Sequence, residues 1–233
     1  MKKQMFLLWV LALIATPMLL ISCAEEDTPP PFFFQVDENG YSNMNRNYLY
    51  QDLNNFPKQT LSDTEKASLA FMREEELLAH DIYTELYKRY SLPVFNNIAN
   101  SEQTHTEAVL VLLERYELDD PAENHTTGIF ADQTLQTLYN TLLARGLENE
   151  VEALKVGALV EEVDIKDLKI QLTEKVDNQD IIYVYENLMK GSRNHLRAFA
   201  KNLRVRGITY IPEVLSQSDY DAIINGGMER GRS

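Results

Sequence analysis

The stretch "NIANSEQTHTEAVLVLLERY", residues 97–116, has the pattern of an amphipathic helix that carries two polar side chains on its apolar face. Steps of four or three residues place one set of side chains on a single stripe of a helix with 3.6 residues per turn: Ile98, Glu102, His105, Val109, Leu112 and Tyr116. Most of these are typical core residues, whereas Glu102 and His105 are a carboxylate and an imidazole one turn apart. The pattern therefore predicts a helix that directs both groups into the protein's own core.

Residues 62–90 predict a second helix with a carboxylate on its core stripe. Ser62 and Glu65 have the spacing of a capping box, which marks the start of the helix. Apolar residues at alternating steps of three and four share their stripe with Glu76. Glu74 lies about 160° from that stripe at 100° per residue, so we expect its side chain in solvent. This helix therefore offers Glu76 to the core.

Two further predicted helices, residues 147–172 and 177–207, repeat this feature. The first has Glu161 and Glu162 in its middle and is apolar on two sides, so the sequence leaves open which carboxylate faces inward. The second places His195 on the side that its apolar residues define. A single histidine on an apolar face is usually a hydrogen-bonded core residue. Here, however, each of the four helices carries a carboxylate or an imidazole on its apolar face.

Ligand-type side chains at similar depth in four helices point to a shared metal ion, because an unpaired buried carboxylate costs several kcal/mol. Carboxylates and imidazoles suit Fe, Mn or Zn, and Glu102-x-x-His105 lets one helix hold one ion or bridge two. The sequence predicts a mononuclear or dinuclear Fe (or Mn, Zn) site with the candidate ligands Glu76, Glu102, His105, Glu161, Glu162 and His195. The alternative is a metal-free polar core whose residues only hydrogen-bond one another.

Four separated motifs resemble, in order, one bacterial and archaeal family. They are "MREEELLAHDIY" (72–83), "PVFNNIANSEQTHTEAVLVLLERYELDDPA" (93–122), "LKVGALVEEVDIKDL" (154–168) and "VYENLMKGSRNHLRAF" (184–199). The family is the ferritin-like domain of unknown function two-two-zero-two, and Glu76 followed by Glu102-x-x-His105 is similar to the first half-site of rubrerythrin-type carboxylate proteins. The resemblance implies an all-α fold: a ferritin-like antiparallel four-helix bundle, residues 61–222, with a long crossover that carries an extra short helix. It implies no reaction, since none is established for the family.

One position departs from the wider superfamily. A full dinuclear site has a second Glu-x-x-His, but the residue three before His195 is Ser192. We expect Ser192 and Tyr83 beside the ligands rather than among them. An asymmetric dinuclear site and a single metal with a second, weak position both remain open.

Composition and charge exclude several classes of function. The 233 residues are 44% hydrophobic and 25% charged with only 9 Gly, which suits one α-rich globular domain plus an appendage. A formal charge of −14 argues against nucleic acid as a partner, because such binding depends on cations that meet phosphates. No Gly-rich phosphate loop, Ser-His-Asp grouping or Cys nucleophile is visible, which disfavours hydrolases.

The first residues predict an export signal and an anchor. Residues 1–22 have the basic start and short apolar run of a signal peptide, and "LISC" at 20–23 resembles the lipobox of bacterial lipoproteins. This resemblance implies cleavage before Cys23 and a lipid on its thiol. Residues 23–60 lack a helical period and contain a Pro run, so they predict a tether. We therefore expect a protein held by lipid to the membrane of a bacterial cell envelope, at its periplasmic face or on the cell surface.

The remaining segments predict a long connection and a tail. Residues 117–146 read as a loop followed by a helix that ends at Gly146, and His125 in this loop is expected at the surface. Residues 223–233 are expected to form a flexible tail. A homodimer stays open, and the sequence names no protein partner.

Three functions from different classes remain. The first is a redox or oxidase-like metalloprotein, the second a metal-binding lipoprotein without turnover, and the third a degenerate helical bundle that acts as a structural or partner-binding surface protein. Whether the protein is an enzyme stays open at this level.

Overall fold

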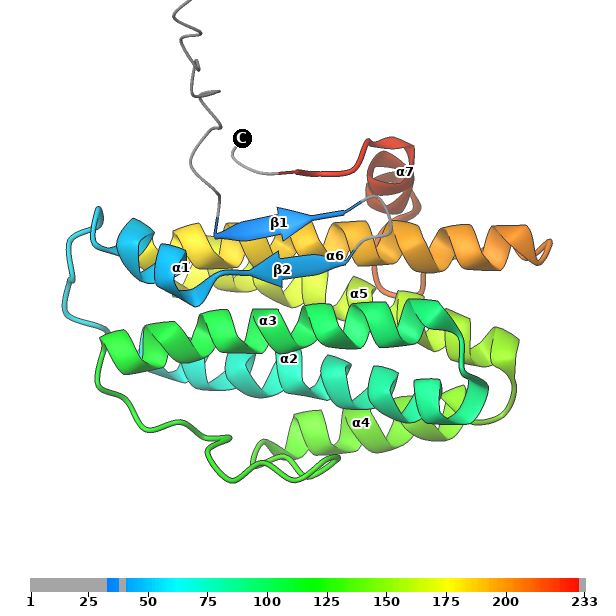
Figure 1. The fold of residues 1–233 in the computed structure, drawn as a ribbon, viewed down its shortest axis with the longest axis horizontal. Coiled ribbons are helices and arrows are strands. Elements are labelled where there is room, and N and C mark those ends of the chain that lie inside the picture. Colours follow the sequence, from blue (N-terminus) through cyan, green and yellow to red (C-terminus); the bar gives the residue numbers. More distant parts are fainter. Residues whose placement is uncertain (1–32, 38–40, 231–233) are drawn as a thin grey trace, which may run out of the picture. The chain divides into compact units, whose positions relative to one another are not determined.

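Four long helices pack side by side and form the centre of the fold. The computed structural model describes residues 33–37 and 41–230. The long helices are α2 (Asp63–Tyr90), α3 (Pro93–Arg115), α5 (Glu150–Ile170) and α6 (Gln179–Val205). α2 packs along α3, and α5 packs along α6, so two helical hairpins lie against each other (Figure 1). The predicted, mainly helical fold class is confirmed for the described part of the chain.

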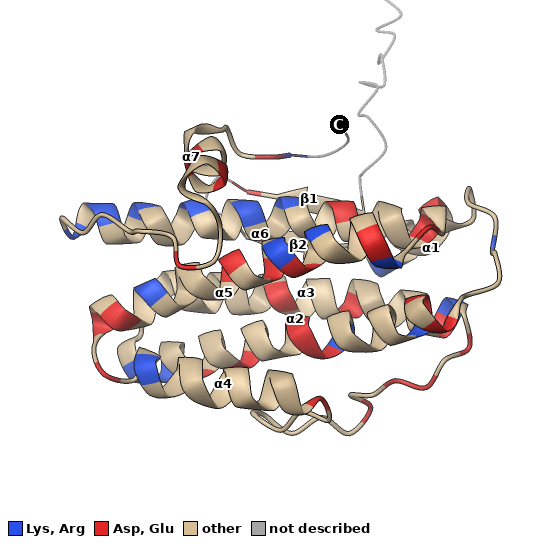
Figure 2. Ribbon diagram, turned by 180° about the vertical axis from the view of Figure 1, so that it is seen from behind, with Lys and Arg blue, Asp and Glu red and all other residues tan. Residues whose placement is uncertain are grey.

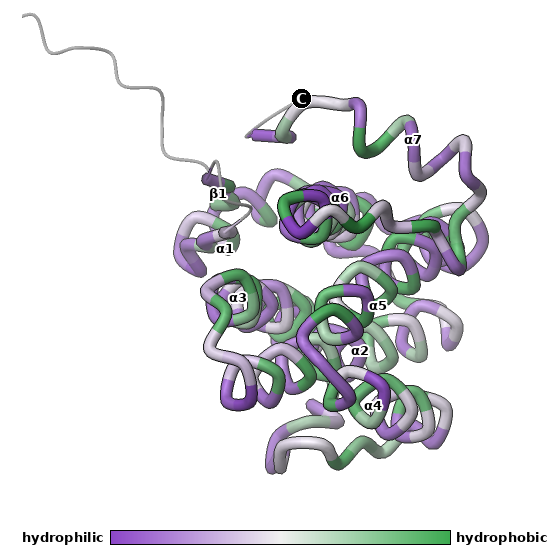
Figure 3. The backbone as a smooth tube through the Cα atoms, turned by 90° about the vertical axis from the view of Figure 1, so that its right-hand side faces the viewer, coloured by the Kyte–Doolittle hydropathy of each residue, from purple (hydrophilic) through white to green (hydrophobic). Residues whose placement is uncertain are grey.

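A crossover joins the two hairpins, because α3 and α5 run in the same direction (Figure 1). The connection spans residues 116–149 and contains α4 (Gln133–Gly146). α4 packs against α2 and α5 on the outside of the four long helices (Figure 3). The predicted extra helix that ends at Gly146 is therefore present in the crossover.

Local hydrogen bonds fix where two of the long helices begin. The Glu65 backbone N–H donates to the Ser62 hydroxyl, and the Ser62 N–H donates to the Glu65 carboxylate, so the predicted capping box is present. α5 continues into one π-helical turn, η1 (Gln171–Lys175). Beyond it, the N–H groups of Asp177 and Asn178 donate to the second oxygen of Glu65. One carboxylate thus ties the start of α2 to the start of α6.

The loop before α4 is fastened to α2 by Glu74. The backbone N–H groups of Ala131 and Asp132 donate to its two oxygens, at 2.6 and 3.0 Å. The expectation that Glu74 faces solvent is therefore wrong. Its side chain is buried because the crossover folds back over α2 and supplies backbone donors that need an acceptor.

Asp81 holds the same loop about two turns further along α2. The Gly128 N–H donates to Asp81 Oδ2 at 2.7 Å, and the Nε2 atom of His125 lies 2.8 Å from the same oxygen. On the other side, His80 Nδ1 lies 3.1 Å from Asp81 Oδ1. His125, expected at the surface, is half-buried as part of this contact.

The segment before α2 is folded onto the four long helices. β1 (Phe34–Val36) pairs antiparallel with β2 (Ser42–Met44), and α1 (Arg46–Leu53) follows. β2 and α1 contact α3, and the Phe34 ring reaches α6. The described part of residues 23–60 thus differs from the predicted tether, because its apolar side chains are buried against the helices. Residues 1–32, with the expected signal peptide and Cys23, lie outside the described residues.

The segment after α6 is also held in place. α7 (Gln217–Asn225) packs on α6, where Lys and Arg positions recur (Figure 2). Arg193 and Arg197 donate to the carboxylate of Glu229. The described residues of the predicted flexible tail, 223–230, are therefore attached to α6. No helix among the described residues is long and apolar enough to cross a membrane.

A polar layer divides the hydrophobic core into two clusters. One cluster surrounds Tyr83, Phe95 and Phe199, and the other contains Met72 and Tyr185. Each of the four long helices contributes to both clusters. In α2, α3 and α6 the residues of the polar layer come where one cluster gives way to the other, whereas Glu161 of α5 lies within the stretch of the first cluster. The layer therefore lies in the interior and consists of side chains from α2, α3, α5 and α6.

Candidate metal centre

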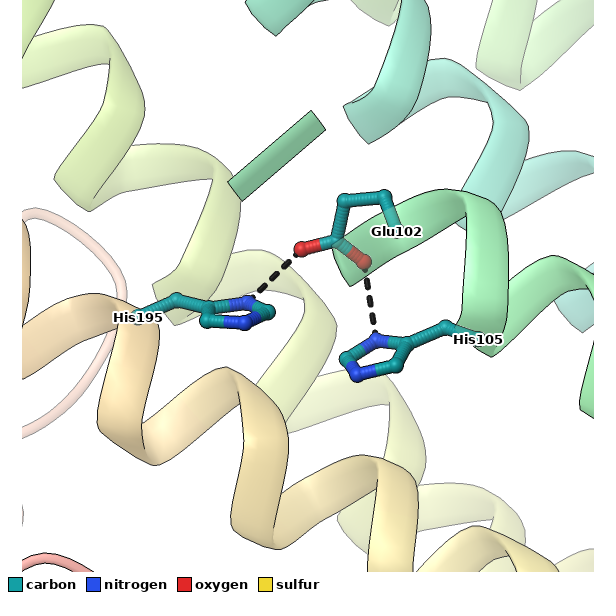
Figure 4. A group of neighbouring side chains, drawn as sticks. All are labelled: Glu102, His105 and His195. Atoms are coloured by element: carbon teal, nitrogen blue, oxygen red, sulfur yellow. Dashed lines mark ion pairs between the residues drawn. The ribbon is translucent and has the colours of Figure 1, made fainter. Parts of the chain in front are cut away.

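The carboxylate of Glu102 lies between two imidazole rings (Figure 4). Its Oε2 is 2.8 Å from Nδ1 of His105, one turn further along α3, and its Oε1 is 2.7 Å from Nδ1 of His195 on α6. The two rings are stacked, with centroids 5.2 Å apart and planes inclined by 17°. One ligand atom from each of the three residues lies within 4.8 Å of the others, so this buried group can hold a metal ion.

Each histidine has a second carboxylate of its own. Glu76 Oε2, from α2, lies 3.1 Å from His105 Nδ1, and Glu161 Oε2, from α5, lies 3.4 Å from His195 Nδ1. The arrangement is therefore two half-sites that share Glu102. Every one of these side chains is at most 2% exposed. We call these five residues the Glu/His cluster.

Hydroxyl groups hold the far side of both rings. The Ser42 hydroxyl lies 3.2 Å from His105 Nε2 and 3.4 Å from His195 Nε2, and the Ser101 hydroxyl lies 3.0 Å from His195 Nε2. A histidine that binds metal through Nδ1 carries its proton on Nε2, and these hydroxyls can accept it. Sequence reasoning missed Ser42, because it belongs to the segment interpreted as a tether.

Gly191 gives the His105 ring its space. A Cβ atom at this position of α6 would lie 2.6 Å from both Cε1 and Nε2 of His105, which is closer than Cβ contacts occur. The same Cβ would lie 3.1 Å from the Phe34 ring. The absence of a side chain at Gly191 therefore allows the imidazole and the N-terminal hairpin to pack directly on α6.

Burial and charge act against each other in the cluster. Burial lowers the pKa of His105, but the carboxylates of Glu102 and Glu76 raise it well above its usual value. Burial also lowers the pKa of His195, but Glu102 and Glu161 raise it to about 9. Burial raises the pKa of Glu76 to about 7, whereas the two imidazoles lower the pKa of Glu102 despite its burial. Without metal the cluster thus holds protons, which a cation can replace.

Tyr83 contacts the cluster, whereas Ser192 bonds within its own helix. The Tyr83 hydroxyl donates to Glu161 Oε1 at 2.5 Å and lies 3.2 Å from the Gly157 carbonyl. The Ser192 hydroxyl donates to the Leu188 carbonyl within α6. Neither residue adds a carboxylate to the second half-site.

Asp164 on α5 is a further buried carboxylate near the cluster. Burial, followed by the charges of Glu76, Glu102 and Glu161, raises the pKa of Asp164 well above its usual value. Asp164 is therefore close enough to the cluster for the charges of its carboxylates to act on it. Sequence reasoning missed it, although Glu161-x-x-Asp164 has the same one-turn spacing as Glu102-x-x-His105.

The donor atoms fit a metal ion. Among the described residues, few buried polar side-chain atoms lack a hydrogen-bond partner, and all of them belong to or adjoin the cluster: Glu75 Oε1 and Oε2, Glu76 Oε1, Asp164 Oδ1 and His195 Nδ1. His195 Nδ1 is near Glu102 but lies outside hydrogen-bond geometry. Buried oxygen and nitrogen atoms without a hydrogen-bond partner need an explanation. A cation that these atoms bind as ligands provides one.

Glu162 does not join the cluster. Its carboxylate accepts from the Tyr210 hydroxyl at 2.5 Å and from the backbone N–H groups of Glu213, Val214 and Leu215, at 2.8 to 3.1 Å. Of the two carboxylates that the sequence left open, Glu161 faces the cluster and Glu162 faces the segment before α7. The placement of Glu162 among the candidate ligands is thereby corrected.

Comparison with known proteins gives the chain relatives without an established function. The family described as "Uncharacterized protein domain (DUF2202)" matches residues 65–227. "Uncharacterized protein MJ0754" of Methanocaldococcus jannaschii is 49% identical over 183 residues, which are 78% of this chain and 98% of the relative. A crystal structure titled as hypothetical protein MJ0754 from Methanococcus jannaschii DSM 2661 is similar with a TM-score of 0.72 and 49% identity, over 74% of this chain and 98% of that one. The helices, the buried cluster and these matches agree, and the chain belongs to the DUF2202 family.

Proposed function

We propose that this protein is a ferritin-like metalloprotein that binds two cations, of iron or manganese, in the Glu/His cluster. The observation that carries the proposal is the position of Glu102, one carboxylate shared by the Nδ1 atoms of two histidines. Each half-site adds one further carboxylate, and Asp164 is a buried carboxylate near both. Oxygen-rich sites with imidazole suit iron and manganese, and zinc is the third candidate.

The helix order supports the ferritin-like assignment. Two antiparallel helix pairs are joined by one long crossover, as in bundles of that type, and the ligands come from all four long helices. The chain departs from that pattern at Ser192, and we infer that Asp164 on the adjacent helix contributes a carboxylate in its stead.

A metal-free polar core is the competing function class, and the unpaired donor atoms argue against it. A satisfied hydrogen-bond network would leave no buried oxygen of Glu76 or Asp164 without a partner. If iron is the bound metal, it would supply redox chemistry, and the protein's own groups would hold it away from solvent and keep protons on the neighbouring side chains. We extend the proposal to a reaction with oxygen or peroxide, which oxygen uptake by the iron-loaded protein would test.

The decisive test measures the stability that metal adds. Binding to the folded state alone adds RT ln(1 + [L]/Kd), about 4 kcal/mol at a thousandfold excess over Kd. We expect Fe(II), without oxygen, or Mn(II) to raise the melting temperature of the native protein relative to EDTA. Glu102→Gln should abolish that difference. Glu162→Gln is the matched control. It neutralises the adjacent carboxylate, which points about 100° away around α5 to the segment before α7, and it should keep the metal-dependent rise.

Two results would contradict the proposal. An equal melting temperature with EDTA and with metal in the native protein would move it to the structural class. Protein purified without chelator that contains no iron, manganese or zinc, and takes up none on dialysis, would have the same consequence.

We also propose that the protein is exported and anchored by a lipid on Cys23. The basic start, the short apolar run and "LISC" at residues 20–23 support this assignment. Mass spectrometry of the native protein should find an acylated Cys23 as its first residue, in the membrane fraction. Cys23→Ser should leave the precursor uncleaved, and a mature protein that starts elsewhere would refute the anchor.

A further inference from the structure

A pair of buried carboxylates outside the Glu/His cluster lines a small cavity between α2, α4 and α5. Glu75 and Asp164 form its polar wall, and apolar residues such as Leu138, Leu142 and Val163 form the rest. The cavity has a volume of about 10 Å³, which is room for one water molecule or one cation. Glu75 is 4% exposed and Asp164 is 6% exposed.

Glu75 has no partner that would explain its burial. In the described chain, neither of its carboxylate oxygens has a hydrogen-bond partner, and Asp164 Oδ1 lacks one as well. Asp164 lines the same cavity, and Asp167 is near enough for its charge to act on Glu75. A carboxylate in such surroundings is costly for the fold, so its presence points to a cation that it meets.

The carboxylates of α5 form a series from the interior to the surface. Glu161, Asp164 and Asp167 follow one another at steps of three residues, which rotates each about 60° from the one before. Their burial changes in the same order: Glu161 is 1% exposed, Asp164 is 6% exposed and Asp167 is half-buried. Glu75 on α2 adjoins this series and is the neighbour of Glu76 in the chain.

We propose that Asp167, Glu75 and Asp164 form an access path along which divalent cations reach the Glu/His cluster. This inference rests on the proposed metal centre. Asp167 is the outer residue, Glu75 and Asp164 hold the cation in the cavity, and Glu76 and Glu161 lie at the inner end. The carboxylates replace water around the cation at each step, so that it crosses the apolar wall of α2, α4 and α5 without being left unpaired.

The cavity suits passage better than storage. A hard divalent cation held for long takes six or more oxygen ligands, or fewer ligands that include imidazole, and the cavity offers two carboxylates and no nitrogen. The Glu/His cluster offers both types of donor. A cation therefore gains by moving inward from Glu75 and Asp164.

Loading of the metal-free full chain with Co(II) tests the path, because Co(II) does not react with oxygen and its absorbance reports binding. Glu75→Gln and Asp167→Asn should each slow loading about tenfold, since a line of negative charge raises local cation concentration and on-rates by that order or more. The final amount of cobalt per chain should stay that of the native protein. Glu174→Gln, an exposed carboxylate on η1, is the matched control and should load at the native rate.

The outcomes separate the path from the centre. Native loading rates in both Glu75→Gln and Asp167→Asn would overturn the path and leave the centre intact. A lower final amount of cobalt in Glu75→Gln at an unchanged rate would make Glu75 a ligand and also overturn the path. A native protein that takes up no cobalt would overturn the proposed centre and the path together. Circular dichroism verifies that each variant folds. If Glu75→Gln does not fold, the loading rate of Asp167→Asn, at a half-buried position, decides whether the path exists.

Discussion

Gly191 of α6 and the imidazole of His105 on α3 are in direct contact, with no room between them for a Cβ atom. Gly191→Ala should therefore displace the ring of His105 and weaken metal binding by about tenfold, which corresponds to 1.4 kcal/mol. Alanine favours a helix by about 1 kcal/mol over glycine, so stability without metal should fall less than metal affinity. Titration with Mn(II) measures the effect.

The neighbouring substitution Lys190→Ala serves as the control and should leave Mn(II) affinity unchanged. If Gly191→Ala binds Mn(II) like the native protein, the position of His105 does not depend on Gly191.

Ser42 should matter for stability, although it lies in a short strand before the helical domain. Its hydroxyl contacts both Nε2 atoms of the histidines, and its N–H donates to Ser101. Ser42→Ala leaves buried polar atoms without a partner, and we expect a loss of about 1–3 kcal/mol in the free energy of unfolding. Urea denaturation measures it. Asn43→Ala, at the exposed position next to it, should cost less than about 0.5 kcal/mol.

The two adjacent carboxylates of α5 should behave differently. Glu161→Gln should reduce metal binding, because Glu161 lies in the cluster. Glu162→Gln should leave metal binding intact but destabilise the fold by about 1–3 kcal/mol, since Glu162 accepts from Tyr210 and from backbone N–H groups before α7. Metal content and urea denaturation of both variants separate the two roles, and a reversed pattern would show that the assignment of the pair is wrong.

Asp81 makes a contribution to stability that depends on pH. Burial raises the pKa of Asp81, but hydrogen bonds from His80, the Gly128 N–H and His125 lower it below its value of 3.8 in the unfolded chain. A lowered pKa means that the contribution is present above about pH 4 and is lost as pH falls through the folded-state pKa. Asp81→Asn should therefore cost about 1–3 kcal/mol at pH 7 and progressively less below pH 4.

Urea denaturation of Asp81→Asn and the native protein from pH 7 to pH 3 measures this contribution. Asp119→Asn, an exposed position on the same connection, should show little difference at any pH. A cost of Asp81→Asn that stays constant with pH would show that the carboxylate acts without its charge.

Helical periodicity was sufficient to find the side chains that meet in the interior. Glu76, Glu102, His105 and His195 each interrupt an otherwise apolar stripe, and the structure brings their carboxylates and imidazoles together. Periodicity failed in α5, because a helix that is apolar on two sides has no single inward direction. Glu161 and Glu162 were therefore indistinguishable, and Asp164 was not found.

The missed features depend on contacts between distant segments. Ser42 lies in a strand of three residues, which is too short for an alternating pattern to be recognised. Glu74 and Asp81 are buried by a loop that returns about fifty residues later, and a local pattern carries no information about that return.

The division of the hydrophobic core by a polar layer has a kinetic consequence. Each long helix packs into both apolar clusters, so no helix can leave the layer without breaking contacts on both sides of it. Fraying at the helix ends does not reach the layer. Exchange of the imidazole N–H protons with solvent therefore requires an opening that involves the whole fold. An ion enclosed there would therefore leave either by a route between side chains or on the time scale of global unfolding.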